Sequence, residues 1–200
     1  MPQLALKRDH FTYGDYLRWP DDERWELIDG VAYAMSAAPS VKHQAVLGGL
    51  LSRIELALRG TPARPYVAPT DVKLSESDVV QPDFLVVCDP AKITASHIAG
   101  APDLIVEVLS PGTSAKDLRD KKALYQRAGV CEYLVVDPLE HYAIRFLLGA
   151  DGYDKGTVFA ADEVLRSATL EAIAIPLWEV FEVPGPGGSG FSRDAPPQAG

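Results

Sequence analysis

Cysteine is scarce in this chain of 200 residues, which contains Cys88 and Cys131 and no other cysteine. Both residues lie in apolar, strand-like sequence, so we expect two reduced thiols in the core and no disulfide. A metal centre built from sulfur ligands is therefore not expected. Long hydrophobic runs are also lacking, because no stretch approaches the roughly 20 apolar residues that span a bilayer. The first residues, MPQLALKRDH, lack the apolar segment of a secretory signal peptide, and we expect a cytoplasmic protein with no membrane contact.

Basic residues are not in excess either. The chain has 19 Lys and Arg against 28 Asp and Glu, which gives a formal net charge of −9. This balance argues against a large basic surface that would grip nucleic acid nonspecifically. It leaves room for a local site, because a bound divalent cation can supply positive charge where a phosphate binds.

The length and the hydrophobic fraction of 47% are typical of one soluble globular domain with a substantial core. We predict a single domain over residues 1–183. Residues 184–200, PGPGGSGFSRDAPPQAG, form a tail that is too rich in Gly and Pro for a packed element.

The most informative stretch is 102–138, which reads as a strand, a helix and a second strand. The apolar run 104–108 is interrupted by one acid, Glu107, and the helix starts near Thr113 and ends at Gly129. With the strand 131–136, this order predicts two neighbouring parallel strands and a helix that covers one face of their sheet. An ionised Glu107 in a buried strand is costly unless a cation or hydrogen-bond donors meet it.

The flanking sequence predicts further strands and helices of a mixed α/β fold. Asp29 and Gly30 indicate a hairpin turn, and the periodic segment 39–60 predicts a long helix across the sheet. The run 79–87 is rich in β-branched residues and contains Pro82 and Asp83, so it predicts an edge strand or a bulge. The remaining predictions are a helix at 12–19, strands at 66–68, 72–74, 142–148, 153–159, 164–168 and 173–175, a loop or short helix at 91–101, and a turn at 177–181.

Three acids, Glu26, Asp83 and Glu107, interrupt apolar strand sequence. Any one of them alone would more often be a tolerated edge residue, but buried carboxylates seldom lack partners. If the strands are neighbours, these oxygens can converge on a hard cation such as Mg²⁺, which would polarise a phosphoryl oxygen and acidify a bound water.

Such a site also needs a lysine to stabilise charge on the phosphate. Lys121 and Lys122 lie on the helix after Glu107, and one of them can point at the acids. The alternative is that both are solvated helix lysines, paired with Asp117 or Asp120 at helical spacing.

Six segments of the chain together show a family resemblance, and they read WELIDG, PSVKHQ, VVQPDFLVV, PDLIVEVLSPGT, DLRDKKALYQRAGV and EYLVVDP. Together they resemble the Uma-type family of restriction-endonuclease-like proteins, in the PD-(D/E)XK nuclease superfamily. The resemblance covers roughly residues 10 to 160. It implies a restriction-endonuclease-like α/β fold with a mixed sheet flanked by helices. It also implies that Asp83 and Glu107 bind the metal, with Glu26 as a supporting acid that helps to position metal or water.

The chain departs from the superfamily at Leu109, where a Glu-x-Lys motif would place its lysine. In the Uma-type pattern this lysine lies on the following helix, at a position that Lys121 matches. The resemblance further implies supporting roles for four residues that match family positions, which are His43, Ser110, Asp117 and Tyr125.

Our first hypothesis is an endonuclease that uses Mg²⁺ or Mn²⁺ to hydrolyse DNA phosphodiester bonds, with Glu26, Asp83, Glu107 and Lys121 as catalytic residues. The second is a catalytically silent protein of the same fold that binds nucleic acid or a protein partner. The acidic balance and the missing Glu-x-Lys lysine favour the second hypothesis. By analogy with enzymes that cut both strands, a homodimer is expected.

A third hypothesis is glycoside hydrolysis by two carboxyl groups without a metal. The chain gives it little support, because Trp19, Trp25 and Trp178 are dispersed and do not indicate a sugar cleft.

Overall fold

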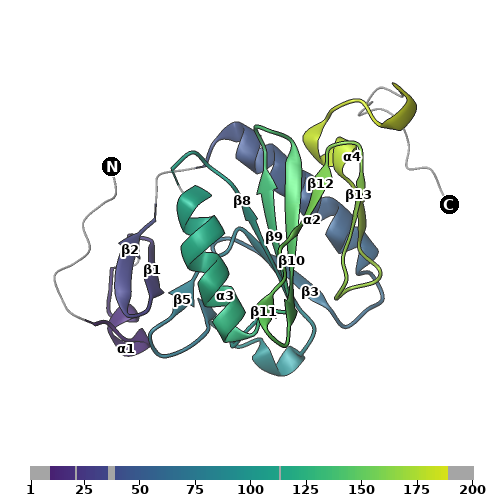
Figure 1. Cartoon of the computed structure of the whole chain (residues 1–200). Coiled ribbons are helices and arrows are strands. Elements are labelled where there is room, and N and C mark those ends of the chain that lie inside the picture. Colours follow the sequence, from purple (N-terminus) through teal and green to yellow (C-terminus); the bar gives the residue numbers. More distant parts are fainter. Residues whose placement is uncertain (1–9, 21, 36–38, 113, 189–200) are drawn as a thin grey trace.

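The fold is a mixed α/β arrangement in which a seven-stranded sheet lies beside a five-stranded one (Figure 1). The computed structural model describes residues 10–20, 22–35, 39–112 and 114–188. The larger sheet has the strand order β11-β10-β9-β8-β6-β3, with β12 also paired to β10. The smaller sheet has the order β2-β1-β5-β4-β7.

The strand-helix-strand unit predicted from the sequence forms the centre of the larger sheet. Strands β8 (Leu104–Val108) and β9 (Glu132–Asp137) are parallel neighbours, and Glu107 lies opposite Val135. The connecting helix begins as a π-helix, η2 (Lys116–Lys121), and continues as α3 (Lys122–Ala128). Gly129, with φ of 88°, ends it in the left-handed conformation that favours glycine.

Antiparallel strands complete the larger sheet on both sides of this unit. The remaining members are β3 (Arg64–Val67), β6 (Phe84–Val87), β10 (Tyr142–Gly149), β11 (Gly152–Tyr153) and β12 (Thr157–Ala160).

Both faces of the larger sheet are covered, which explains why its central strands are apolar on both sides. Figure 1 shows α3 in front of the sheet and α2 (Val41–Ala57) behind it. Side chains of alternate residues, such as Val106 and Ile105, enter the core under α2 and the core under α3 respectively. The core under α2 also includes residues of α4 (Leu177–Phe181), which follows the hairpin β13 (Val164–Arg166) and β14 (Ala174–Pro176).

The smaller sheet begins with the predicted hairpin. Strands β1 (Trp25–Ile28) and β2 (Val31–Ala34) are joined by Asp29 and Gly30, whose φ values of 52° and 73° suit a tight two-residue turn. The other members are β4 (Val72–Lys73), β5 (Val79–Val80) and β7 (Ile98–Ala99). A short helix, α1 (Tyr13–Tyr16), lies at this end of the molecule and begins with a capping box between Thr12 and Asp15.

The prediction of one bulged strand over 79–87 is wrong. Strand β5 belongs to the smaller sheet and β6 to the larger one, so the chain crosses between the sheets at Gln81, Pro82 and Asp83. Pro82 has no amide hydrogen to donate to a ladder, so it suits this crossing. Asp83 consequently lies at the seam between the two sheets.

Two smaller predictions also need correction, and the predicted domain boundary is not tested. Cys131 is exposed and Cys88 is half-buried, so neither is a core thiol, although both are free as expected. Segment 91–101 contributes the strand β7 and the end of a short 3-10 helix, η1 (Pro90–Lys92). Of the predicted tail, Pro186–Gly188 form a 3-10 turn, η3, and residues 189–200 lie outside the described part, so the division at residue 183 stays a prediction.

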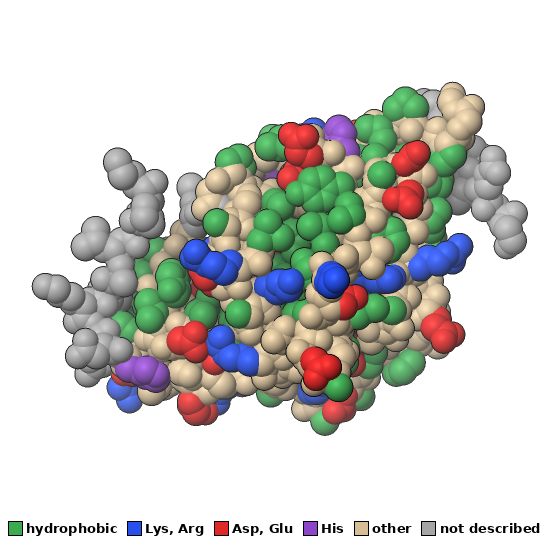
Figure 2. Space-filling view, in the orientation of Figure 1, with side chains coloured by type: hydrophobic (Ala, Val, Ile, Leu, Met, Phe, Trp, Pro, Cys, Tyr) green, Lys and Arg blue, Asp and Glu red, His purple; other side chains and the backbone are tan. Residues whose placement is uncertain are grey.

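Charge is interspersed on the face that Figure 2 shows. Lys and Arg side chains form a narrow row across its middle, with acidic side chains above and below the row. This face therefore carries no continuous basic surface. In the described part of the chain, no helix combines the length and the hydrophobicity that crossing a membrane requires.

Candidate active site

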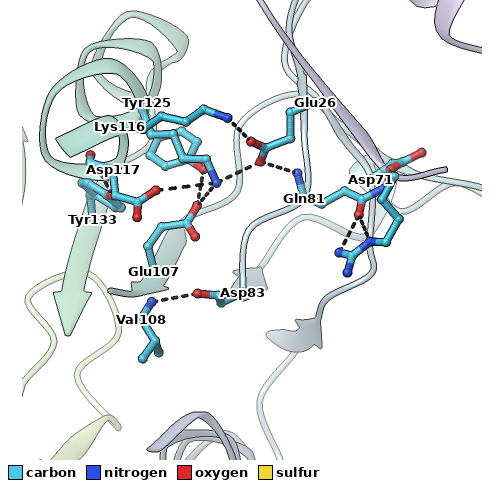
Figure 3. Close-up of polar contacts among 12 residues, drawn as sticks. Glu26, Asp71, Gln81, Asp83, Glu107, Val108, Lys116, Asp117, Tyr125 and Tyr133 are labelled. Carbon is cyan, nitrogen blue, oxygen red and sulfur yellow. Dashed lines mark hydrogen bonds and ion pairs between the residues drawn. The ribbon is translucent and has the colours of Figure 1, made fainter. Parts of the chain in front are cut away.

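The predicted acids come together at the seam between the two sheets (Figure 3). Glu26 projects from β1 and Glu107 from β8, and their exposed fractions are 2% and 3%. Lys121, the last residue of η2, is 5% exposed and lies between them. Its Nζ is 2.8 Å from Glu26 Oε1 and 2.9 Å from Glu107 Oε1. The acids thus enclose an ammonium group within a largely buried cluster.

Spacing along the helix explains why Lys121 and not Lys122 faces the acids. Asp117, Lys121 and Tyr125 are four residues apart and lie on one face, with Asp117 Oδ1 3.9 Å from Lys121 Nζ. The Tyr125 hydroxyl donates a hydrogen bond of 2.7 Å to Glu107 Oε1. Lys122 instead places its Nζ 3.8 Å from the centroid of the Phe146 ring. The alternative of two solvated lysines is therefore wrong for Lys121.

Asp83 lies next to this cluster and is held by different partners. Its Oδ2 accepts a hydrogen bond of 2.8 Å from the amide of Val108, the residue after Glu107 (Figure 3). His43, buried at the start of α2, has its Nε2 3.1 Å from the same oxygen. The side chain of Asp83 is 23% exposed, so it is the most accessible of the three predicted acids.

The sequence reasoning missed Lys116 and Gln81. Lys116 Nζ lies 2.6 Å from Glu26 Oε2 and 4.6 Å from the centroid of the Tyr33 ring. The backbone amide of Gln81 donates to Glu26 Oε1 at 3.2 Å. The position of Lys116 directly before Asp117, on the same helix, was the one feature of the sequence that could have indicated its place in the site. It was not sufficient, because helix lysines are usually solvated.

The lysines set the pKa of Glu26. Burial alone would raise the pKa of this carboxyl, but the charges of Lys121 and Lys116 outweigh burial and lower it to about 2. Burial alone would likewise lower the pKa of Lys121, and the carboxylates of Glu107 and Glu26 raise it well above its usual range. Glu26 and Lys121 are therefore charged at neutral pH.

The pKa of Glu107 is shifted in the opposite direction from that of Glu26. Burial raises its pKa, Lys121 offsets part of that effect, and the charges of Asp83 and Asp117 raise the pKa further, to about 8. Four carboxyl groups and two ammonium groups share this region, so full ionisation would leave two negative charges uncompensated within the set. The raised pKa of Glu107 thus reflects its burial first and this excess of negative charge second.

The oxygen donors present fit a hard divalent cation held by Asp83 and Glu107. Glu107 Oε1 accepts from Lys121 and Tyr125, and Figure 3 shows its second oxygen on the side of Asp83. The excess negative charge favours a cation at this point. Both oxygens of Glu26 are occupied by lysines, so metal binding by Glu26 stays a prediction that this arrangement does not favour. Among the described residues, no three His, Cys, Asp or Glu side chains are gathered as a preformed metal site.

The cluster opens into a cavity of about 340 Å³. Glu26, Asp83, Glu107 and Lys121 line it, together with the predicted supporting residues His43, Ser110 and Asp117. Of the predicted site residues, Tyr125 alone is not among the cavity-lining residues, and it acts from behind Glu107.

Tyr125→Phe is expected to lower the free energy of unfolding by about 1–2 kcal/mol, because it removes a buried hydrogen bond to a carboxyl group. The ring and its contact with Tyr133, 5.0 Å between centroids, are retained. Urea denaturation measures the loss. Tyr153→Phe is the matched control and should cost less, because its hydroxyl donates to the neutral carbonyl of Val130. Equal losses in the two variants would contradict a special role for the Glu107 contact.

The chain is similar to known proteins in both sequence and fold. A family described as "Uma2: Putative restriction endonuclease" matches residues 13–177. An uncharacterized protein of Synechocystis sp., slr1290, is 31% identical over 128 residues, which are 61% of this chain and 66% of that protein. This match spans slightly less than two thirds of the relative's own length.

A solved structure has a similar fold. The crystal structure of a "putative nuclease belonging to DUF820" from Anabaena variabilis has a TM-score of 0.71 and 19% identity, covering 86% of this chain and 97% of that one. This likeness confirms the predicted restriction-endonuclease-like α/β fold. Because the family match covers most of the chain, the protein belongs to the Uma2 family, described as "Putative restriction endonuclease", and the resemblance read from the sequence is confirmed.

Proposed function

We propose that this protein is an endonuclease that hydrolyses DNA phosphodiester bonds with Mg²⁺ or Mn²⁺. The observation that carries the proposal is the buried Lys121 ammonium, shared by Glu26 and Glu107, beside Asp83 in an open cavity. Membership of the Uma2 family supports the same activity.

The proposed roles follow from the contacts. Asp83 and Glu107 would hold the cation, which when bound polarises a phosphoryl oxygen and acidifies a water. Lys121 donates to the phosphate as negative charge develops on it. Glu26 holds Lys116 and Lys121 at the site through its two oxygens. This role takes the place of the metal-binding role first expected of Glu26.

The remaining residues act as supports in this proposal. Tyr125 orients Glu107, and His43 orients Asp83. Such partners of metal-binding carboxylates fix their position and tune their affinity.

A nicking assay on supercoiled DNA tests the proposal. The purified protein should nick the DNA with Mn²⁺ or Mg²⁺ and stop when EDTA is added. Asp83→Asn and Glu107→Gln are each expected to slow nicking at least about 100-fold, since a metal contributes several kcal/mol to such a transition state. Glu55→Gln, an exposed acid on α2, is the matched control and should keep full activity. Activity that survives both site changes would reject the assignment.

Two observations favour the catalytically silent alternative. Both oxygens of Glu26 face lysines, and the described residues contain no preformed group of three metal ligands. Calorimetry with Mn²⁺ distinguishes the two functions, because a silent protein should bind no metal. Homodimerisation and cytoplasmic location stay predictions, and sedimentation analysis would test the first of them.

A further inference from the structure

We propose that the cavity accepts a single unpaired nucleotide, so that the substrate is a single strand or an unpaired segment of DNA rather than continuous duplex. This inference rests on the proposed nuclease function and names its substrate class. It is carried by the size of the cavity, the depth of the acids and the chemistry of its two walls.

The cavity is too small for a duplex. Its volume of about 340 Å³ lies within the range of pockets that hold one small ligand, about 300–1,000 Å³, so it suits one nucleotide and not a duplex. Glu107 and Lys121, which line it, are largely buried, with side-chain exposures of 4% and 6%. A phosphate of an unpaired nucleotide approaches such buried groups more easily than one within stacked duplex. Enzymes that act inside such pockets take single strands or extrude the target nucleotide.

The two walls of the cavity match the two parts of a nucleotide. One wall carries Asp83, Glu107 and the two lysines, which suit a phosphate with a cation. A second set of lining residues, the apolar wall, suits a base face, which apolar and aromatic side chains can cover. Its members are Leu47, Gly48 and Leu51 of α2, with Val67 and Ala68 at the end of β3.

Gly48 indicates that this apolar wall is kept open. Glycine is the least favourable residue after proline in a helix interior, and Gly48 lies in the middle of the 17-residue helix α2. A Cβ atom there would meet nothing within 4 Å, so close packing does not require glycine. Its neighbour Gly49 differs, because a Cβ there would lie 3.4 Å from the backbone of Val180. A side chain at the exposed position 48 would therefore extend into open space at the cavity lining.

The positively charged side chains that line the cavity are suited to bind a short piece of DNA backbone. Among the described residues they are Arg24, Lys116 and Lys121. Proteins that hold duplex nonspecifically neutralise many phosphates at once, which a chain with a net charge of −9 is poorly equipped to do. A few phosphates of one strand need fewer cations, and base contacts then supply part of the affinity.

The test compares three labelled DNA substrates of the same sequence: a single strand of about 12 nucleotides, a length within known single-strand site sizes, its blunt duplex, and a duplex with a single-stranded flap. The full chain with Mn²⁺ should cleave the single strand and the flap at least about 10-fold faster than the duplex, as loss of base contacts implies. Fluorescence anisotropy in EDTA should show the same order of binding.

Variants on α2 locate the site. Gly48→Leu should weaken binding and cleavage of the single strand at least about 10-fold, because its side chain fills the space for the base. Gly48→Ala should give a smaller loss and keeps the test valid if leucine disturbs the helix. Ala45→Leu is the matched control, since Ala45 is exposed on the same helix and does not line the cavity. Its binding should equal that of the unaltered chain.

The outcomes separate this inference from the proposed function. Equal or faster cleavage of the blunt duplex, or an unchanged Gly48→Leu, would overturn the inference and leave the nuclease proposal standing. Binding of the single strand that depends on Gly48, without any cleavage, would support the cavity as a nucleotide site and reject the nuclease. If no DNA is bound or cleaved, both proposals fail.

Discussion

Lys121→Met is expected to lower the free energy of unfolding by about 3–5 kcal/mol, the usual cost of removing one partner of a buried ion pair. The ammonium group contacts Glu26 at 2.8 Å and Glu107 at 2.9 Å, and its side chain is 6% exposed. Without it, two buried carboxyl groups lose their shared donor. DNA cleavage should also fall at least about 100-fold, because the lysine is proposed to stabilise charge on the phosphate.

Lys116→Met is the matched control, since Lys116 binds the same Glu26 from a side chain that is 24% exposed. Water can replace this ammonium more easily, so we expect a cost of about 1 kcal/mol. Urea denaturation of both variants gives the comparison, with cleavage measured where each is fully folded. A loss for Lys121→Met no larger than that for Lys116→Met would contradict its role as the central counter-charge.

A second substitution, added to Lys121→Met, tests whether the loss of stability comes from uncompensated charge. Adding Glu107→Gln to Lys121→Met removes one of the two stranded carboxyl groups, while Glu26 still has Lys116. The double variant should therefore recover part of the lost stability and remain inactive. Such non-additivity is expected for residues in one ionic network.

The central crossover unit could be predicted from the sequence because its signals are local. The apolar run around Glu107, the helix that ends at Gly129 and the next apolar run leave few arrangements for two parallel strands. The four-residue spacing of Lys121 and Tyr125 likewise put both on one face of that helix, and the structure shows that this face meets Glu107. The family resemblance placed Asp83 in the same site before its neighbours in space were known.

The remaining features depend on long-range contacts that local patterns do not encode. Nine residues rich in β-branched side chains look like one strand, and pairing of β5 with β1 and of β6 with β8 is what divides them. The π-helical turn at η2 changes which helix residues face Glu26, so Lys116 could not be assigned from a regular helical period.

In the absence of metal, the protein is expected to lose stability as the pH rises from about 5 to about 8, and Glu107→Gln should remove most of this loss. Burial and the neighbouring carboxylates raise the pKa of Glu107 from 4.5 to about 8. Between these values the folded chain retains a proton that the unfolded chain has released, so the free energy of unfolding falls with pH. Glu26, with its pKa lowered to about 2, has the opposite effect and loses its contribution as the pH falls below about 4.5.

Urea denaturation in EDTA across this pH range measures the effect, and Glu55→Gln should follow the unaltered chain. A Glu107→Gln variant with the same pH slope as the unaltered chain would show that another group is responsible. Adding Mn²⁺ extends the test, because a cation held by Asp83 and Glu107 requires the ionised carboxyl and displaces its proton. Mn²⁺ should therefore stabilise the unaltered chain more at about pH 8 than at about pH 5, and should stabilise Glu107→Gln little at either pH. An equal Mn²⁺ effect on both proteins would place the cation elsewhere, since the negative charge that attracts it at the seam between the sheets depends on Glu107.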